Sequence, residues 1–182
     1  MRHNDSGARG AGSGRTVKGT RSVAAPMPPR VGPRLFRTMI NLWPAIRGTG
    51  QRVVFVADDW SEVRVVLPLN WRTRNYVGTI FGGSMYGACD PHFMLLLIHR
   101  LGDEFVVWDK SASIRFRRPG RTKLYATFRV PDEEVAAIKE ALRHGPKVDR
   151  TYSVDLVDAD GVVHATVEKV VHVRRKHPAP SD

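Results

Sequence analysis

Cysteine is almost absent from this sequence: Cys89 is the only one in 182 residues. A single cysteine excludes an internal disulfide and any zinc site built from several cysteines. Long apolar runs are absent as well, because the longest one, residues 93–98, is far shorter than the roughly 18 residues that cross a bilayer. We therefore expect a protein of the reducing cytoplasm with no membrane-spanning segment.

Acidic residues are scarce at the N-terminus. Residues 1–34 hold seven basic residues and one acid, Asp5, so they carry more than half of the net charge of +11. This stretch is rich in glycine, arginine, serine and proline, and it lacks both the apolar residues of a core and the continuous apolar segment of a secretory signal. We predict a disordered basic tail over residues 1–32 and a second tail over residues 176–182.

The remaining residues, 33–175, have the composition and length of one globular domain. Apolar residues at helical spacing predict a helix over residues 33–46, and Pro131 followed by three acids predicts another that stops at Gly145. Alternating apolar residues predict six strands. These are residues 52–57, 62–69, 105–118, 124–130, 150–157 and 162–174.

The central stretch, residues 75–101, begins as a glycine-rich loop and becomes the most apolar segment of the chain. A helix that is apolar on every side has to be covered on every side. Six strands connected mostly as hairpins therefore predict an α+β fold in which an antiparallel sheet wraps around this helix.

Asp90 is the one carboxylate in the apolar part of that stretch, and two interpretations explain it. In the first, Asp90 caps a helix that begins at Pro91. In the second, the helix begins near Gly83, Pro91 interrupts it, and Asp90 projects from its buried middle. The spacing alone favours neither.

The segment Asn75-x-x-Gly78-x-x-Phe81-Gly82-Gly83, with Asp90 seven residues further on, resembles the hotdog-fold thioesterases of the phenylacetate-degradation type. That family has the motif Asn-x-x-Gly-x-x-His-Gly-Gly and a catalytic Asp at the same distance. The resemblance covers about residues 33–174. The stretches F-G-G-S-M-Y-G-A-C-D-P and V-V-W-D-K-S-A look closer still to an uncharacterised bacterial branch of hotdog proteins, a domain of unknown function.

The resemblance implies a hotdog fold, a homodimer or a tetramer, and acyl-thioester sites at the subunit interface. It favours Asp90 as a site residue that takes a proton from water or attacks the carbonyl. The amides of Gly82 and Gly83 would supply an oxyanion hole. Asn75 would orient the water or the carbonyl, or else only shape its turn, and Ser84 is a possible hydroxyl donor or an ordinary helix residue.

Phe81 stands where the family motif has histidine, and this difference leaves two functions open. The first is hydrolysis of acyl-CoA thioesters. The alternative is a non-catalytic acyl-CoA-binding protein, a sensor or carrier. Neither needs a cofactor beyond the coenzyme A part of the ligand. No carboxylate or cysteine stands at a recognisable metal-ligand spacing from His92 or His99, so we predict no metal.

Coenzyme A is a polyphosphate, so basic residues near the motif are candidates to bind it. They precede the motif or surround the Pro119-Gly120 turn, and they are Arg72, Arg74, Arg115, Arg117, Arg118, Arg121 and Lys123. A solvated strand edge would also explain them. We expect no nucleic-acid partner, because the sequence shows no recognised binding motif and no aromatic stacking pattern beside these residues.

Overall fold

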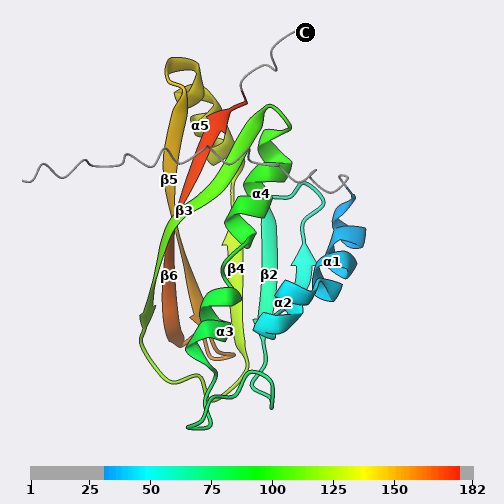
Figure 1. Ribbon diagram of the computed structural model, residues 1–182, viewed down its shortest axis with the longest axis vertical. Helices are drawn as coiled ribbons and strands as arrows, with labels where there is room; N and C mark the ends of the chain where they lie inside the picture. Colours follow the sequence, from blue (N-terminus) through cyan, green and yellow to red (C-terminus); the bar gives the residue numbers. More distant parts are fainter. Residues whose placement is uncertain (1–30, 177–182) are drawn as a thin grey trace, which may run out of the picture.

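A computed structural model describes residues 31–176, so the predicted tails lie almost entirely outside the described residues. The chain forms one six-stranded antiparallel sheet in the order β1-β2-β4-β5-β6-β3 (Figure 1). Its strands are β1 Arg52–Val56, β2 Glu62–Leu67, β3 Phe105–Phe116, β4 Leu124–Arg129, β5 Lys147–Val157 and β6 Val163–Arg175. The predicted α+β class, strand number and antiparallel pairing are confirmed.

Five helices accompany the sheet: α1 Pro33–Leu42, α2 Pro44–Thr49, α3 Gly82–Gly87, α4 His92–Leu101 and α5 Asp132–His144. In Figure 1, α3 and α4 follow one another along a face of the sheet, α2 lies beside α3, and α1 lies against β1. Phe93, Leu96 and Leu97 of α4 are buried against the sheet. Central helix and wrapped sheet together make the hotdog fold. None of the helices among residues 31–176 is long and apolar enough to cross a membrane.

The prediction of one continuous helix over residues 33–46 is wrong, because the helix is interrupted at Trp43. This residue is extended, with φ −63° and ψ 127°. A residue that precedes proline is pushed out of the helical region by the proline ring, so Pro44 ends α1 and then begins α2. The second helix ends at Gly50, whose φ of 84° favours glycine.

The central helix is also divided, between Gly87 and His92. Pro91 has no N–H to donate to the carbonyl of Gly87, and the side-chain amide of Gln51 donates to that oxygen instead, at 3.1 Å. Asp90 thus lies in the link between α3 and α4. The structure agrees with the second interpretation in that the helix begins at Gly82 and is interrupted at Pro91, but the interruption spans residues 88–91, so Asp90 lies half exposed in the link and not in a buried helical middle.

Candidate functional site

Lys169 of β6 carries a positive charge into the centre of the molecule, where its side chain is fully buried. Its ammonium donates to the backbone carbonyl of Asp90, to Asp90 Oδ1 at 3.1 Å and to Asp109 Oδ2 at 2.7 Å. A buried ammonium is costly unless such acceptors replace water. The three contacts therefore hold the link between α3 and α4 against the sheet.

Asp109 of β3 is the second carboxylate of this cluster. It lies at an irregularity in the pairing of β3 with β6, and within the described part of the chain its buried Oδ1 has no hydrogen-bond partner. Burial raises the pKa of Asp109, Lys169 opposes this shift, and the charge of Asp90 adds to it. Two carboxylates thus share one ammonium.

The Asp90 carboxylate is still 49% exposed and faces a cavity of about 330 Å³. Tyr86, one helical turn earlier, hydrogen-bonds to Asp90; burial first and this carboxylate second raise the pKa of Tyr86 to about 12. Its phenol therefore stays neutral and donates. The rest of the lining is mostly apolar and comes from α1, α2 and α4: Ile40, Trp43, Ala45, Ile46, Met94 and Leu95.

Behind Asp90, His92 and Gln51 form a buried polar pair. The Nε2 atom of His92 lies 2.7 Å from Oε1 of Gln51, whose amide nitrogen is engaged with Gly87, so His92 donates. Burial, with the charge of Lys169 adding to it, lowers the pKa of His92 to about 3. Burial likewise raises the pKa of the Cys89 thiol to about 12, which makes this cysteine a poor nucleophile.

His99 packs face to face with Trp60, with ring centroids 3.5 Å apart. Among residues 31–176, no group of three His, Cys, Asp or Glu side chains is placed to hold a metal ion.

Asn75 has its side chain engaged within its own loop. Its Oδ1 accepts from the backbone N–H groups of Val77 and Thr79, at 3.1 and 2.9 Å, and its Nδ2 donates to the Thr79 hydroxyl at 2.9 Å. Gly78 inside this loop has φ 83°. The amide therefore shapes the turn that leads into α3.

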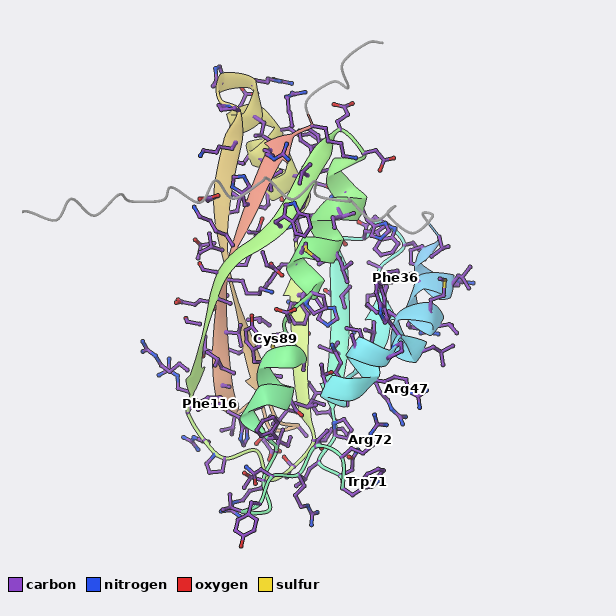
Figure 2. The ribbon with its side chains drawn as sticks, viewed as in Figure 1. Phe36, Arg47, Trp71, Arg72, Cys89 and Phe116 are labelled. Carbon is purple, nitrogen blue, oxygen red and sulfur yellow. The ribbon has the colours of Figure 1, made fainter. Side chains whose placement is uncertain are left out.

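Gly82 and Gly83 begin α3, and their N–H groups precede its first turn, which closes with a bond from Met85 N to Phe81 O. Aromatic rings lie directly against both glycines. A Cβ atom on Gly83 would meet the Phe81 ring at 2.3 Å, and one on Gly82 would meet the Phe116 ring at 2.9 Å. Phe116 at the end of β3 is beside α3 in Figure 2. Ser84, the next residue, is buried.

The predicted site residues do not all meet in one chain. Asn75 and Gly82 line a cavity of about 380 Å³ that also contains Arg117 and Arg118, whereas Asp90 lines the separate apolar cavity. The other predicted basic residues are exposed: Arg115 with Arg117 borders a small hollow of about 110 Å³, Arg72 lines a further cavity, and Arg74, Arg121 and Lys123 line none of these.

Lys169 and Asp109 were missed from the sequence, although one signal was there. Residues 163, 165, 167, 171 and 173 of β6 alternate as apolar side chains on the core face, and Lys169 occupies the missing position of that face. A lysine on the buried face of a strand needs a hydrogen-bond acceptor in the core, because its ammonium is cut off from water. The sequence does not say which acceptor, because Asp90 and Asp109 are 79 and 60 positions away.

These features define the class of protein: a hotdog-fold domain whose broken central helix presents a carboxylate beside a cavity. Within that class the chain belongs to the family described as Domain of unknown function (DUF4442), which it matches over residues 32–173. Comparison with curated proteins finds no significant match.

Solved structures share the fold at low sequence identity. A Pseudomonas aeruginosa protein described as of unknown function and a probable thioesterase superposes with a TM-score of 0.71 at 19% identity, covering 79% of this chain and 95% of its own. A Haemophilus influenzae thioesterase gives 0.61 at 12% identity, covering 84% and 96%. A mutant thioesterase from Pseudomonas aeruginosa gives 0.59 at 12%, covering 78% and 94%.

We predict that Lys169→Met lowers the free energy of unfolding by about 3–5 kcal/mol, because the methionine leaves the backbone carbonyl of Asp90 and the carboxylate of Asp109 without a donor. Urea unfolding measures the change. Lys110→Met is the matched control: Lys110 is 58% exposed on β3, and its ion pair with Asp149 is a surface pair whose loss has little effect. Equal destabilisation by the two variants would contradict the role given to Lys169.

We predict that His92 makes the fold sensitive to acid. Its pKa is lowered from 6.5 to about 3, so below about pH 6.5 the unfolded chain binds a proton that the native state excludes, and stability falls as the pH drops toward about 3. His92→Gln should lose less stability than the wild type between about pH 7 and about pH 4 in urea titrations. His144→Gln, at an exposed histidine, should keep the wild-type pH dependence. Parallel curves for wild type and His92→Gln would disprove this assignment.

Proposed function

We propose that this protein hydrolyses acyl-CoA thioesters and that Asp90 is its catalytic carboxylate. One observation carries the proposal: Asp90 faces a mostly apolar cavity of the size of a small ligand site while Lys169 holds its backbone and side chain from behind. The description of other hotdog-fold structures as thioesterases supports the same reaction class.

The chemistry follows from the surroundings of Asp90. The apolar cavity takes the acyl group, and the half-exposed carboxylate accepts a proton from a water that attacks the thioester carbonyl. Lys169 and the neutral Tyr86 phenol both hydrogen-bond to this carboxylate and so hold it in one orientation. The tetrahedral intermediate collapses with cleavage of the C–S bond, and the coenzyme A thiolate leaves as the thiol by taking the proton from Asp90, which restores the carboxylate.

The oxyanion that forms on the carbonyl needs N–H donors, and we assign these to Gly82 and Gly83. In one chain these glycines and Asp90 lie at opposite ends of α3, whose six residues rise about 9 Å. The two groups also lie at different cavities. The donors and the carboxylate acting on one carbonyl therefore come from two copies of the chain, and Asn75 and Ser84 remain predicted site residues beside the donors.

A second copy would pair along β3. This strand ends the sheet order, so one of its edges has no neighbouring strand among the described residues, and it holds Asp109 next to Asp90. Trp108 and Phe116 of the same strand are 64% and 55% exposed. An unpaired edge with exposed aromatic residues favours association of two copies, and we propose a homodimer.

Phe81 favours the second candidate, a non-catalytic acyl-CoA-binding protein. Its ring lies against Gly83, at the start of the helix whose amides would receive the oxyanion. The ring fills the space into which a side chain at Gly83 would project, so it covers the Gly83 backbone on that side. If the ring does not move, the cavities bind an acyl thioester without turning it over.

We predict that Asp90→Asn lowers thiol release from a panel of acyl-CoAs by about 10²–10⁴-fold, the usual contribution of a general base. Binding of the same acyl-CoAs, measured by calorimetry, should be nearly unchanged. Asp160→Asn, at an exposed turn residue, is the control and should keep full activity. Binding without turnover in the wild type and in both variants would instead establish the carrier or sensor function.

We predict that light scattering gives twice the chain mass for the wild-type protein and a lower mass for Trp108→Glu, because a buried charge at the β3 edge opposes pairing. Leu35→Glu, also at an exposed apolar residue but on α1, should leave the mass unchanged. A monomeric wild type would refute the two-copy site.

A further inference from the structure

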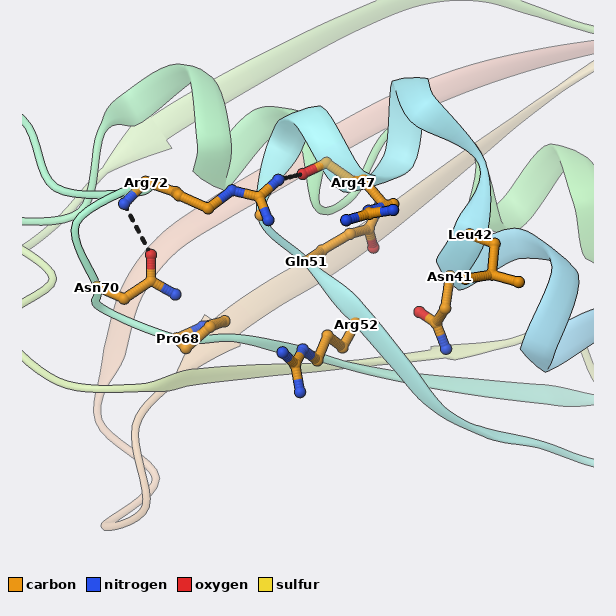
Figure 3. A pocket seen from close by; sticks show the side chains of 9 residues that line it. Asn41, Leu42, Arg47, Gln51, Arg52, Pro68, Asn70 and Arg72 are labelled. Atoms are coloured by element: carbon orange, nitrogen blue, oxygen red, sulfur yellow. Dashed lines mark hydrogen bonds between the residues drawn. The ribbon is translucent and has the colours of Figure 1, made fainter.

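The short helix α2 separates two cavities of opposite character. Ala45 and Ile46 line the apolar cavity that contains Asp90. Arg47 and Gly50 line a second cavity of about 410 Å³, bounded by β1 and by residues 68–72 (Figure 3). Nothing in the proposed hydrolysis uses this second cavity.

Three arginines from separate segments line the second cavity: Arg47 of α2, Arg52 of β1 and Arg72 after β2. Figure 3 shows their side chains reaching into the same space. Its remaining polar side chains are neutral amides, those of Asn41, Gln51 and Asn70, and none of the described lining residues is acidic.

Some arginines of this protein lie beside carboxylates. Arg129 pairs with Glu62, and Arg150 pairs with Glu134. Within residues 31–176, none of the ion pairs includes one of the three cavity arginines. Like charges around one cavity repel each other, and an anion bound between them would convert that repulsion into attraction.

Arg72 is already held in place for such a role. Its guanidinium donates to the backbone carbonyl of Arg47 at 2.5 Å, and its own backbone N–H donates to Asn70 Oδ1 at 2.9 Å, as the dashed lines in Figure 3 mark. A guanidinium has five N–H donors, so most of those of Arg72 remain for a ligand. A side chain ordered before binding loses less entropy when the ligand arrives.

We propose that this cavity is an anion site that binds the phosphate groups of a polyphosphate ligand. Each arginine guanidinium can bind two oxygens of a phosphate group at once. The cavity lining contains no carboxylate that would compete with the phosphate for the arginines. That the polyphosphate belongs to coenzyme A rests on the proposed function; the anion site itself does not. It also differs from the predicted basic cluster around Pro119-Gly120, which lies at another cavity.

Calorimetric titration of the full chain with inorganic pyrophosphate tests the site without any need for turnover. The double variant Arg47→Gln/Arg52→Gln should bind pyrophosphate about 100-fold more weakly, about tenfold for each charged contact removed. Arg72 is left intact because it holds α2. The double variant Arg129→Gln/Arg143→Gln loses the same charge at two exposed positions that line none of these cavities, and it should bind as the wild type does.

Each outcome decides the proposal. It is overturned if the wild type does not bind pyrophosphate, if Arg47→Gln/Arg52→Gln binds it equally well, or if both double variants lose affinity alike, since that would be a non-specific charge effect. Titration with coenzyme A and with dephospho-coenzyme A shows which phosphate groups the cavity binds. If Arg47→Gln/Arg52→Gln loses affinity for both ligands, the diphosphate that they share is the group bound in the cavity. Pyrophosphate binding without thiol release in the wild type would retain the anion site and reject the thioesterase.

Discussion

The ammonium of Lys169 inside the sheet is the contact on which the centre of this protein depends. It satisfies a free carbonyl in the link between α3 and α4, and it places two carboxylates, Asp90 and Asp109, on one donor. Because Lys169 comes from β6, the position of the link is set by the sheet and not by the helices alone. This arrangement leaves half of the Asp90 carboxylate exposed. The adjoining cavity, which is otherwise mostly apolar, therefore has one acidic group in its lining.

Breaking the central helix is what makes room for that contact. Pro91 removes the N–H that would have bonded the Gly87 carbonyl, and Gln51 at the start of the first hairpin replaces it while also pairing with His92. The break therefore leaves no buried backbone group of Gly87 unpaired, and it turns Asp90 out of the helix toward α1 and α2. The same α2 then separates an apolar cavity from an arginine-lined one, which gives the two sides of the helix different ligand chemistry.

Much of the fold was predictable because it rests on local patterns. Alternation in residues 62–69 and 124–130 predicted β2 and β4, and Pro131 with the three acids after it predicted α5. Two helix breaks were missed or misplaced, at Trp43 and at residues 88–91, since a proline inside an apolar pattern can either kink a helix or end it. For the candidate site, Asp90 was singled out as an anomaly, but its partner Lys169 was not, because nothing local pairs residues so far apart in the chain.

The sequence by itself determined the strands and their antiparallel pairing, because periodicity and turn residues act over a few positions. The hotdog class came from the resemblance of the segment around Gly82 and Gly83 to a known motif. Only the tertiary structure decided which polar groups meet. It brought Lys169 to Asp90 and Asp109, kept Gly82 and Asp90 at separate cavities, and gathered Arg47, Arg52 and Arg72 around a third. Such contacts join segments distant in the chain, and their energies depend on burial and geometry, which appear only when the sheet has closed around the helix.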